Sequence, residues 1–442
     1  MNLREYQLRA VESWVASGYK SIFAMATGTG KTATAMECMR LLHQKLRSEY
    51  KSLTVVVVCP LIHLIDQWAV YFEEAGWRVT KAYQSKAAWA SEIIEQSKQS
   101  ATTPGLKQAV IVTQATFTGG NFQQALNEIP GEILLVGDEV HNLGAKSVIG
   151  KLPLRAGYRL GLSATPSRWG DSTGTELLVQ YFGEISYTLT ISDAIALGAL
   201  CEYKYFPRVT YLTFEETLEY VELTKALGQI LKGRNFEELS DVEQEKAGKI
   251  LRFRAAVIGM AREKMPQLLN DLKLNKNKPG QLIYCPEGSS AGVRFIDEFR
   301  NQLTSRGFFP AEIYDANTKK DHRRGILESF TRGELPYILS MRCLDEGVDI
   351  PSAEYAYFVS SSSNPRQFVQ RRGRVLRQNG GKEMALIYDY FVVPNLLAVQ
   401  EALDVEISIG KRELFRVLDF IDACSNKAEA LLLIEPLRKF YE

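Results

Sequence analysis

A glycine-rich segment near the N-terminus has the residue types and the spacing of a phosphate-binding loop. The segment MATGTGKT runs from Met25 to Thr32, between an apolar run and a helix-like stretch. Its glycines let the backbone curl until the N–H groups point at phosphate oxygens, while Lys31 reaches the β- and γ-phosphates and the Thr32 hydroxyl binds Mg²⁺. The predicted phosphate-binding residues are Thr27, Gly28, Thr29, Gly30, Lys31 and Thr32. A glycine-rich turn that binds nothing is the alternative, and the loop by itself does not identify the type of NTPase.

Two adjacent carboxylates follow a second apolar run, in the segment LLVGDEVHN (residues 134–142). In a parallel sheet the carboxyl ends of the strands meet at the edge where ligands bind. At that edge Asp138 is suited to hold Mg²⁺, and Glu139 is suited to polarise the attacking water as general base. A solvated turn that carries both acids is the alternative, and the buried strand that precedes them argues against it.

Two long segments of alternating apolar runs and helical stretches must position these side chains. The strand-like runs of the first segment are 21–25, 52–59, 109–113, 132–138 and 158–163, and those of the second are 281–285, 311–315, 336–340, 356–360 and 384–390. Such alternation predicts parallel sheets with helices on both faces, and therefore two α/β domains.

The segment between the two domains and the C-terminal tail have a helical composition. Capping boxes at Thr213 with Glu216 and at Ser240 with Glu243 predict two helices in a charge-rich insertion of about seventy residues. The expected apolar stripes are Leu218, Val221, Leu227, Ile230 and Leu231 in the insertion, and Leu414, Phe415, Val417, Leu418 and Ile421 in the tail. The polar segment 275–280 is expected to form a hinge into the second domain.

Composition argues against several classes of protein. The six cysteines and four histidines are scattered, so neither a disulfide framework nor a zinc site is expected, and the thiols should be buried and reduced. No apolar run is long enough to span a bilayer and the N-terminus lacks the apolar core of a signal peptide, which predicts an intracellular, cytoplasmic protein. Because the net charge is only +1, a groove for nucleic acid must be basic locally. Trp14, Trp68 and Trp77 are expected in the core.

The acidic cluster DEVH resembles the DEAH-type box of superfamily 2 helicases, with Val140 where alanine or cysteine is commoner. Further segments that resemble helicase motifs follow in the expected order: LREYQ (3–7), CPLIHLIDQW (59–68), VTQATF (112–117), GLSATP (161–166), LIYCP (282–286), LDEGVDIP (344–351) and QRRGRVLR (370–377). This resemblance covers most of the chain and implies two tandem RecA-like domains that use ATP and Mg²⁺ and bind nucleic acid. It implies a first RecA-like domain (1–204), a helical, thumb-like insertion (205–275), a second RecA-like domain (276–395) and a helical C-terminal tail (396–442).

The resemblance also implies roles for individual residues. Arg374 and Arg377 would act as arginine fingers and Gln370 would position the water, with a solvated basic helix as the alternative. Further nucleotide contacts are Arg4 and Gln7 at the adenine and Gly347 and Asp349 in the second domain, although Gln7 alternatively just begins an amphipathic helix. The residues that couple hydrolysis to domain movement are His141, Ser163 and Thr165. The nucleic-acid contacts are Pro60, Leu61, Thr113, Thr116, Thr318 and Arg342, each with a structural strand-end cap as the alternative.

Within superfamily 2, SATPSRWGD (163–171), the segment 182–203 and NPRQFVQRRGRVLR (364–377) resemble XPB-like helicases and the motors of restriction and phage-defence systems. That branch implies ATP-dependent translocation on, or remodelling of, double-stranded or forked DNA in a restriction, repair or phage-defence system. A separate nuclease or effector protein is an expected partner, and a membrane is not. Two alternatives stay open: an ATP-gated sensor that clamps nucleic acid and recruits an effector, and an RNA-directed helicase.

Overall fold

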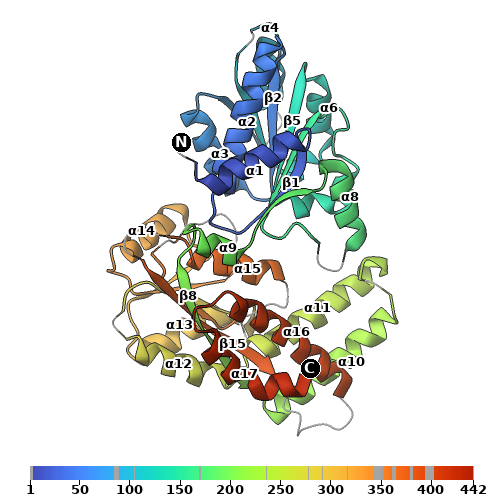
Figure 1. Cartoon of the computed structure of the whole chain (residues 1–442). Coiled ribbons are helices and arrows are strands. Elements are labelled where there is room, and N and C mark those ends of the chain that lie inside the picture. The colour runs from blue at the N-terminus through green and yellow to red at the C-terminus, as the bar shows by residue number, and fades with distance from the viewer. Residues whose placement is uncertain are drawn as a thin grey trace. The chain divides into compact units, whose positions relative to one another are not determined.

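The computed structural model describes residues 3–83, 89–103, 105–168, 171–234, 236–276, 278–290, 292–315, 317–341, 350, 352–360, 365–378, 382–393 and 403–441. The chain forms two compact units, Met1–Ala194 and Ile195–Glu442. Each unit has its own parallel sheet with helices packed around it (Figure 1). The predicted fold class, two α/β domains with parallel sheets, is therefore confirmed.

The first unit is built on a seven-stranded parallel sheet in the order β3-β4-β2-β5-β6-β1-β7. Its strands are β1 (Lys20–Met25), β2 (Leu53–Cys59), β3 (Arg78–Ala82), β4 (Gln108–Thr113), β5 (Glu132–Asp138), β6 (Tyr158–Ser163) and β7 (Ile185–Leu189). Its helices are α1 (Glu5–Ala16), α2 (Lys31–Ser48), α3 (Ile62–Glu74), α4 (Ala90–Thr102), α5 (Gln114–Phe117), α6 (Gly120–Glu128), the 3₁₀ helix η2 (Val140–Gly144), α7 (Lys146–Ile149) and α8 (Ser172–Phe182). Every residue of β2 is buried, which means that both faces of this sheet are covered, as its continuous apolar run predicts.

The second unit begins within α9 (Ile191–Ala196) and is built on a six-stranded parallel sheet in the order β12-β13-β9-β14-β15-β8. Its strands are β8 (Glu202–Tyr211), β9 (Gln281–Tyr284), β12 (Ala311–Tyr314), β13 (Tyr337–Ser340), β14 (Tyr355–Phe358) and β15 (Met384–Val393), and β10 (Ser289–Ser290) pairs separately with β11 (Val293–Arg294). Its helices are α10 (Phe214–Leu231), the 3₁₀ helix η3 (Phe236–Glu238), α11 (Asp241–Gly259), α12 (Lys264–Leu274), α13 (Phe295–Ser305), α14 (Lys320–Thr331), α15 (Pro365–Val375), α16 (Leu403–Asp422) and α17 (Lys427–Tyr441). All five strands predicted for this unit are present.

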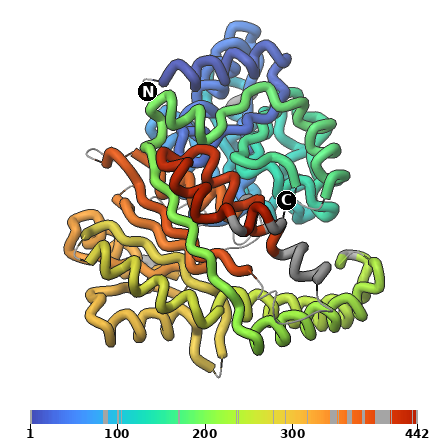
Figure 2. The backbone as a smooth tube through the Cα atoms, turned by 60° about the horizontal axis from the view of Figure 1, so that its bottom comes forward, coloured from blue at the N-terminus to red at the C-terminus, as the bar shows by residue number. Residues whose placement is uncertain are grey.

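Strand β8 places the boundary between the units earlier than the sequence predicts. It pairs in parallel with β15 along its whole length, from Glu202 opposite Met384 to Tyr211 opposite Val393. Figure 2 shows the two segments running side by side. The two compact units divide after Ala194, whereas the sequence places the boundary after residue 204. The physical reason is that an alternating strand pattern does not say which sheet the strand will join.

The segment predicted as a helical insertion contains more than one kind of structure. After β8, helices α10 and α11 form a packed pair (Figure 1), and each begins with its predicted capping box. The Thr213 hydroxyl accepts the Glu216 backbone N–H at 3.3 Å, and the Ser240 hydroxyl accepts that of Glu243 at 3.4 Å. The leucines of α12, in contrast, pack in the core of the second unit. Segment 275–280 thus joins α12 to β9 of the same unit, and the prediction of an inter-domain hinge there was wrong.

Two members of the predicted apolar stripes point into solvent. On α10, Val221 is buried but Leu218 is 37 % exposed. On α16, Val417 is buried whereas Phe415 is 64 % exposed, and Phe420 lies in the core instead. A helix buries only the side that faces its neighbour, and the sequence pattern does not define the edges of that side to within one residue.

The tail helix α16 is anchored to the second sheet by a buried ion network. The Arg416 guanidinium pairs with Asp389 of β15 and, at 2.7 Å, with Glu413 of its own helix. The Tyr205 hydroxyl of β8 donates to the same Asp389 carboxylate at 2.8 Å. All four side chains are buried. Because buried charges are tolerated only while they are paired, this network holds the tail on the second unit.

Replacing Arg416 with alanine is expected to lower the free energy of unfolding by about 3 to 5 kcal/mol, because two carboxylates would stay buried without their cation. Chemical denaturation followed by circular dichroism measures this loss. The matched control is Arg324→Ala, which removes an exposed partner of Glu328 and should cost less than about 1 kcal/mol. Equal losses in the two variants would contradict a structural role for the network.

Several side chains lie in the interior as the sequence predicts. The buried unpaired cysteines are Cys38, Cys59, Cys201, Cys285 and Cys424, while Cys343 lies outside the described residues. The three tryptophans expected in the core, Trp14, Trp68 and Trp77, are 6 % exposed or less. In the part of the chain that the structure describes, no helix has the length and apolar character needed to cross a membrane.

Candidate active site

The glycine-rich segment forms a tight loop between β1 and α2. Gly28 and Gly30 have φ values of 90° and 81°, in the left-handed region that favours glycine, and Gly30 is the residue that caps α2. The loop is closed by the Thr29 hydroxyl, which donates to the Ala26 carbonyl at 2.7 Å. The Lys31 ammonium folds back and donates to the Met25 carbonyl at 3.1 Å. The loop N–H groups therefore gather at the N-terminus of an eighteen-residue helix, where the helix dipole favours an anion.

The donors of this loop fit a triphosphate. The Thr27 hydroxyl is buried and, among the described residues, no protein group accepts or donates a hydrogen bond to it. A buried hydroxyl is normally paired, so this one is placed for a group that the protein does not itself supply. Together with the Lys31 ammonium and the curled backbone, it gives the loop the donor set that phosphate oxygens require.

Helix α1 braces the loop from the N-terminal side. The Gln7 side-chain amide donates to the Thr29 and Gly30 carbonyls at 3.4 and 3.3 Å, and its oxygen accepts the Arg4 backbone N–H at 2.9 Å. The Tyr6 hydroxyl donates to the Thr29 carbonyl at 2.9 Å. A Cβ atom on Gly30 would lie 2.5 Å from the Gln7 amide nitrogen, so this contact requires glycine. Gln7 is thus both part of the amphipathic helix and a support of the loop, and Tyr6 shares a role that sequence reasoning missed.

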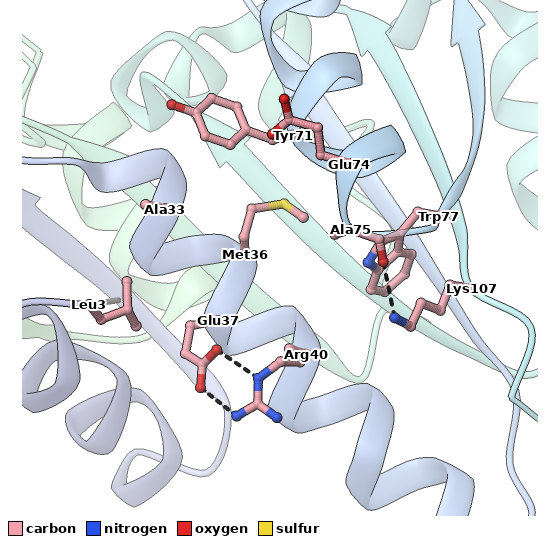
Figure 3. Close-up of a pocket in the computed structure, with 10 residues that line it drawn as sticks. All are labelled: Leu3, Ala33, Met36, Glu37, Arg40, Tyr71, Glu74, Ala75, Trp77 and Lys107. Atoms are coloured by element: carbon pink, nitrogen blue, oxygen red, sulfur yellow. Dashed lines mark hydrogen bonds and ion pairs between the residues drawn. The ribbon is translucent and has the colours of Figure 1, made fainter. Parts of the chain in front are cut away.

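A pocket of about 400 Å³ adjoins the loop. Figure 3 shows Leu3 and Ala33 at one end of it and Trp77 and Lys107 at the other. Leu3 directly precedes Arg4, and Ala33 directly follows Thr32, so these two lining residues are sequence neighbours of predicted nucleotide-binding residues. The other lining residues are Met36, Glu37, Arg40, Tyr71, Glu74 and Ala75.

The acidic cluster lies at the carboxyl end of β5, as predicted, and its second acid has an unusual backbone. Glu139 has φ 46° and ψ 57°, a left-handed conformation that costs a residue other than glycine about 1 to 3 kcal/mol. The Ser163 hydroxyl at the end of β6 donates to Glu139 Oε2 at 3.3 Å and lies 3.0 Å from His141 Nδ1. The Thr165 backbone N–H donates to the same hydroxyl at 3.1 Å. The structure therefore brings the three predicted coupling residues together around Glu139.

The Asp138 carboxylate is held by a tryptophan that the sequence alone did not single out. The Trp68 indole N–H donates to Asp138 Oδ2 at 2.9 Å, and the Glu139 backbone N–H donates to Oδ1 at 3.1 Å. Burial raises the pKa of the Asp138 carboxyl, while the Trp68 hydrogen bond and the positive charge of Lys31 oppose that rise. The phosphate loop follows β1 and the acidic cluster follows β5, and both strands pair in parallel with β6, so the two segments lie along the same edge of the sheet. The sequence signal for Trp68 was its place in the segment CPLIHLIDQW.

Arg168 is a further residue that sequence reasoning missed. Its guanidinium donates to the His141 carbonyl and pairs with Asp171 at 2.7 Å. It therefore fixes the segment after β6 against the turn that carries His141. The signal was its position two residues after the proline that ends GLSATP.

The arginine cluster of the second unit divides into structural residues and candidate catalytic ones. Arg371 donates to the Ser360 carbonyl at 2.7 Å, and Arg372 binds the Asp419 carboxylate of α16 at 2.7 Å. Gln370 and Arg374 are buried on the same helix, 6 % and 7 % exposed. Because these side chains are buried, the alternative of a solvated basic helix is wrong. Arg377, half-buried, follows the helix and pairs through its backbone with Leu200.

The predicted nucleic-acid contacts lie at the ends of strands, where several have structural partners. The Thr113 hydroxyl accepts the Thr116 backbone N–H at 3.2 Å and so caps the short helix α5. The Thr318 hydroxyl donates to the Ile313 carbonyl at 3.2 Å. Pro60 is half-buried and Leu61, the N-cap residue of α3, is 38 % exposed. Arg342, predicted to contact nucleic acid, lies outside the described residues, and so do Gly347 and Asp349, predicted to contact the nucleotide.

Family models match both units. Residues 1–168 match the family described as "Type III restriction enzyme, res subunit", and residues 262–379 match the "Helicase conserved C-terminal domain". The chain is also similar to the DNA 3'-5' translocase XPB2 of Sulfurisphaera tokodaii. The two are 30 % identical over 403 residues, which cover 88 % of this chain and 81 % of that protein.

Two solved structures have the same fold at low sequence identity. An ATP-dependent type ISP restriction-modification enzyme, LlaBIII, bound to DNA superposes with a TM-score of 0.62 at 16 % identity, over 96 % of this chain and 30 % of that one. The Hef helicase domain of Pyrococcus furiosus superposes with a TM-score of 0.54 at 16 % identity, over 92 % of this chain and 98 % of that domain. These matches identify the same family as the order of helicase-like motifs along the sequence. The chain belongs to the superfamily 2 helicases, motors that hydrolyse ATP on two RecA-like units, and within them to the XPB-like and restriction-type branch.

Proposed function

We propose that this protein is an ATP-driven motor that moves on, or remodels, double-stranded DNA. The observation that carries the proposal is the placement of the phosphate loop, the Asp138 carboxylate and the Ser163-held Glu139 at the carboxyl ends of the neighbouring strands β1, β5 and β6. The choice of DNA is supported by the similarity to XPB2, which is a DNA translocase, and by the fold shared with a DNA-bound restriction enzyme.

In the proposed reaction the phosphate loop holds ATP and the acidic cluster activates water. Lys31 and the N–H groups at the start of α2 bind the β- and γ-phosphates, and Thr32 and Asp138 hold Mg²⁺. Mg²⁺ held by these residues would supply positive charge to the phosphate oxygens. Glu139 orients the attacking water and accepts its proton, and the hydroxyl of Ser163 keeps the Glu139 carboxylate in place. The adenine base lies at the Leu3 and Ala33 end of the pocket, beside Arg4 and Gln7.

The second unit contributes arginines in this scheme. Arg374 and Arg377 contact the γ-phosphate in the ATP-bound state, and Gln370 helps to position the water. A guanidinium is always charged and offers two parallel donors to phosphate oxygens, which suits it to a charge that grows in the transition state. Release of this contact after hydrolysis lets the two units separate, so that each ATP drives one cycle of movement.

The helix pair α10–α11 is the proposed contact for the DNA backbone. Helix α11 exposes Lys246, Lys249 and Arg252 at helical spacing, next to Phe253, which is 50 % exposed. The Lys249 ammonium lies 5.9 Å from the centre of the Phe253 ring. Helix α10 exposes Glu215, Glu219 and Glu222 together with Lys225, whereas the exposed acids of α11, Asp241 and Glu245, lie in its first two turns. From Lys246 onward the exposed charges of α11 are basic, so phosphates are attracted to that part of the helix.

Replacing Lys246, Lys249 and Arg252 together with glutamine is expected to weaken duplex binding and to reduce the steepness of its salt dependence. Loss of three phosphate contacts should lower the slope of log K against log salt by about 2 to 3. Fluorescence anisotropy of labelled duplex at several salt concentrations measures this. The matched control is Glu215, Glu219 and Glu222 of α10, also exposed, changed to glutamine. If the control lowers the slope equally, or the basic variant leaves it unchanged, α11 is not the contact.

The experiment that tests the function is an ATPase titration with single-stranded DNA, duplex, forked DNA and RNA. Duplex or forked DNA should stimulate hydrolysis most, and the protein should then displace a bound roadblock from the duplex. Stimulation by duplex without displacement would indicate an ATP-gated sensor that clamps DNA, and stimulation by RNA alone would indicate an RNA-directed helicase. Either result overturns the proposal of a DNA motor.

The cellular role proposed for this motor is in a restriction, repair or phage-defence system, together with a separate nuclease or effector protein. The match of the first unit to the res subunit of type III restriction enzymes supports this role. Purified protein with ATP and Mg²⁺ should leave plasmid DNA uncut, and cleavage by the chain alone would remove the need for a nuclease partner.

A further inference from the structure

The indole of Trp68 connects helix α3 to the acidic cluster. Its N–H donates to Asp138 Oδ2 at 2.9 Å, the side chain is 1 % exposed, and its ring packs on Phe72 with 5.9 Å between ring centres. The other oxygen, Oδ1, accepts the Glu139 backbone N–H at 3.1 Å. With one donor on each oxygen and no room for the indole to move, the plane of the carboxylate is fixed.

We propose that Trp68 is a positioning residue for ATP hydrolysis, which holds the Asp138 carboxylate in the orientation that receives Mg²⁺. The inference rests on the proposed function, which assigns Asp138 to that ion. A carboxylate oxygen accepts two hydrogen bonds, so each oxygen of Asp138 keeps capacity for a water of the hydrated ion. Because Mg²⁺ requires near-ideal octahedral geometry, a carboxylate that rotates binds it less well. Loss of the indole N–H would permit that rotation.

Helix α3 gives the same hydrogen bond a second consequence. The helix begins at Ile62, directly after Pro60 and Leu61, and Trp68 lies nearly two turns further along it. A packed helix moves as a rigid element. A nucleic-acid strand bound at the start of α3 would therefore shift Trp68, and with it the Asp138 carboxylate. Stimulation of the ATPase by nucleic acid therefore depends on Trp68 as well.

The test replaces Trp68 with phenylalanine, which keeps an aromatic ring and removes the N–H. The matched control is Trp14→Phe. Trp14 is fully buried in the same unit, and its indole also donates at 2.9 Å, but to the Arg159 carbonyl. Both variants lose one buried indole hydrogen bond of the same length, and only Trp68→Phe changes a contact to Asp138. Their losses in melting temperature should be similar.

The expected difference lies in the dependence on Mg²⁺. Trp68→Phe should raise the Mg²⁺ concentration for half-maximal ATPase by about tenfold, as loss of a partner that orients a metal ligand does. Saturating Mg²⁺ should restore kcat, the KM for ATP at saturating Mg²⁺ should be unchanged, and binding of a fluorescent ATP analogue in EDTA should match wild type. The stimulation by duplex DNA should also fall in Trp68→Phe and not in Trp14→Phe. Equal Mg²⁺ requirements in the two variants overturn the inference.

A third variant separates this inference from the proposed function. If Asp138→Asn keeps wild-type, Mg²⁺-dependent turnover, the assignment of the ion to Asp138 has failed. If Asp138→Asn is inactive while Trp68→Phe behaves like Trp14→Phe, the proposed function stands and the role of Trp68 has failed. Should Trp68→Phe not fold, ¹⁵N-tryptophan spectra of the otherwise unchanged protein replace it. The indole signal that moves in Asp138→Asn must then also move when Mg²⁺ and ATP are added, and a static signal overturns the inference.

Discussion

Glu139→Gln is expected to lower the ATPase turnover number by at least about a hundredfold while ATP binding is retained, because the general base is lost. The amide has the shape of the carboxylate but cannot accept the proton of the attacking water. Its oxygen can still accept the hydrogen bond that Ser163 donates to Glu139 Oε2 at 3.3 Å, so the local structure should persist. Steady-state ATPase assays and equilibrium binding of a fluorescent ATP analogue measure the two effects separately.

The control for this variant lies on the same strand. Glu132→Gln makes the same change at the first residue of β5, at the end of the strand opposite to the acidic cluster. It should leave turnover and ATP binding unaltered. Normal turnover in Glu139→Gln would exclude Glu139 as the base. A loss of nucleotide binding equal to the loss of turnover would show that the variant disturbs the phosphate loop instead.

Replacing Arg377 with alanine should slow ATP hydrolysis by about 10³- to 10⁵-fold with little loss of ATP affinity. In free energy this is about 4 to 7 kcal/mol of barrier. The reason is that an arginine finger binds charge that develops only in the transition state, so that the bound ground state hardly changes. Single-turnover hydrolysis with saturating duplex DNA, combined with nucleotide binding, measures both quantities.

Arg372→Ala serves as the comparison, because Arg372 lies five residues earlier, within α15, and has a structural partner. Arg372 is 3 % exposed and binds the Asp419 carboxylate at 2.7 Å, so its loss should lower the melting temperature. Arg377→Ala should keep the melting temperature and lose hydrolysis. Hydrolysis at the wild-type rate in Arg377→Ala would defeat the assignment of the finger, and a large loss of stability there would place Arg377 with the structural arginines.

Much of the site was predictable because local sequence dictates it. Glycines are needed where the loop before α2 takes positive φ values, and Gly28 and Gly30 have them. Acids that follow a fully apolar run emerge at the carboxyl end of a buried strand, where Asp138 lies. The capping boxes at Thr213 and Ser240 begin helices because each satisfies backbone N–H groups within one turn. These features depend on residues a few positions apart.

Other features depend on contacts between distant parts of the chain. The left-handed backbone of Glu139 is a property of the folded site, since its own residue type disfavours that conformation. The segment QRRGRVLR reads as one basic cluster. In the structure, however, Arg371 donates to the Ser360 carbonyl and Arg372 binds the Asp419 carboxylate, both within the same unit. The sequence pattern does not reveal these two contacts, because Ser360 and Asp419 lie outside the segment and only the fold brings them near.

The sequence by itself determined the two parallel-sheet units, the loop for phosphate, the pair of acids and the family, because all of these are recorded in short-range patterns of apolar, glycine and charged residues. Only the tertiary structure decided that β8 joins the second sheet, that Arg416 fastens the tail to Asp389, and that Trp68 holds Asp138. Each of these joins residues far apart in the chain, and hydrogen bonding, ion pairing and burial select such partners only once the chain has packed.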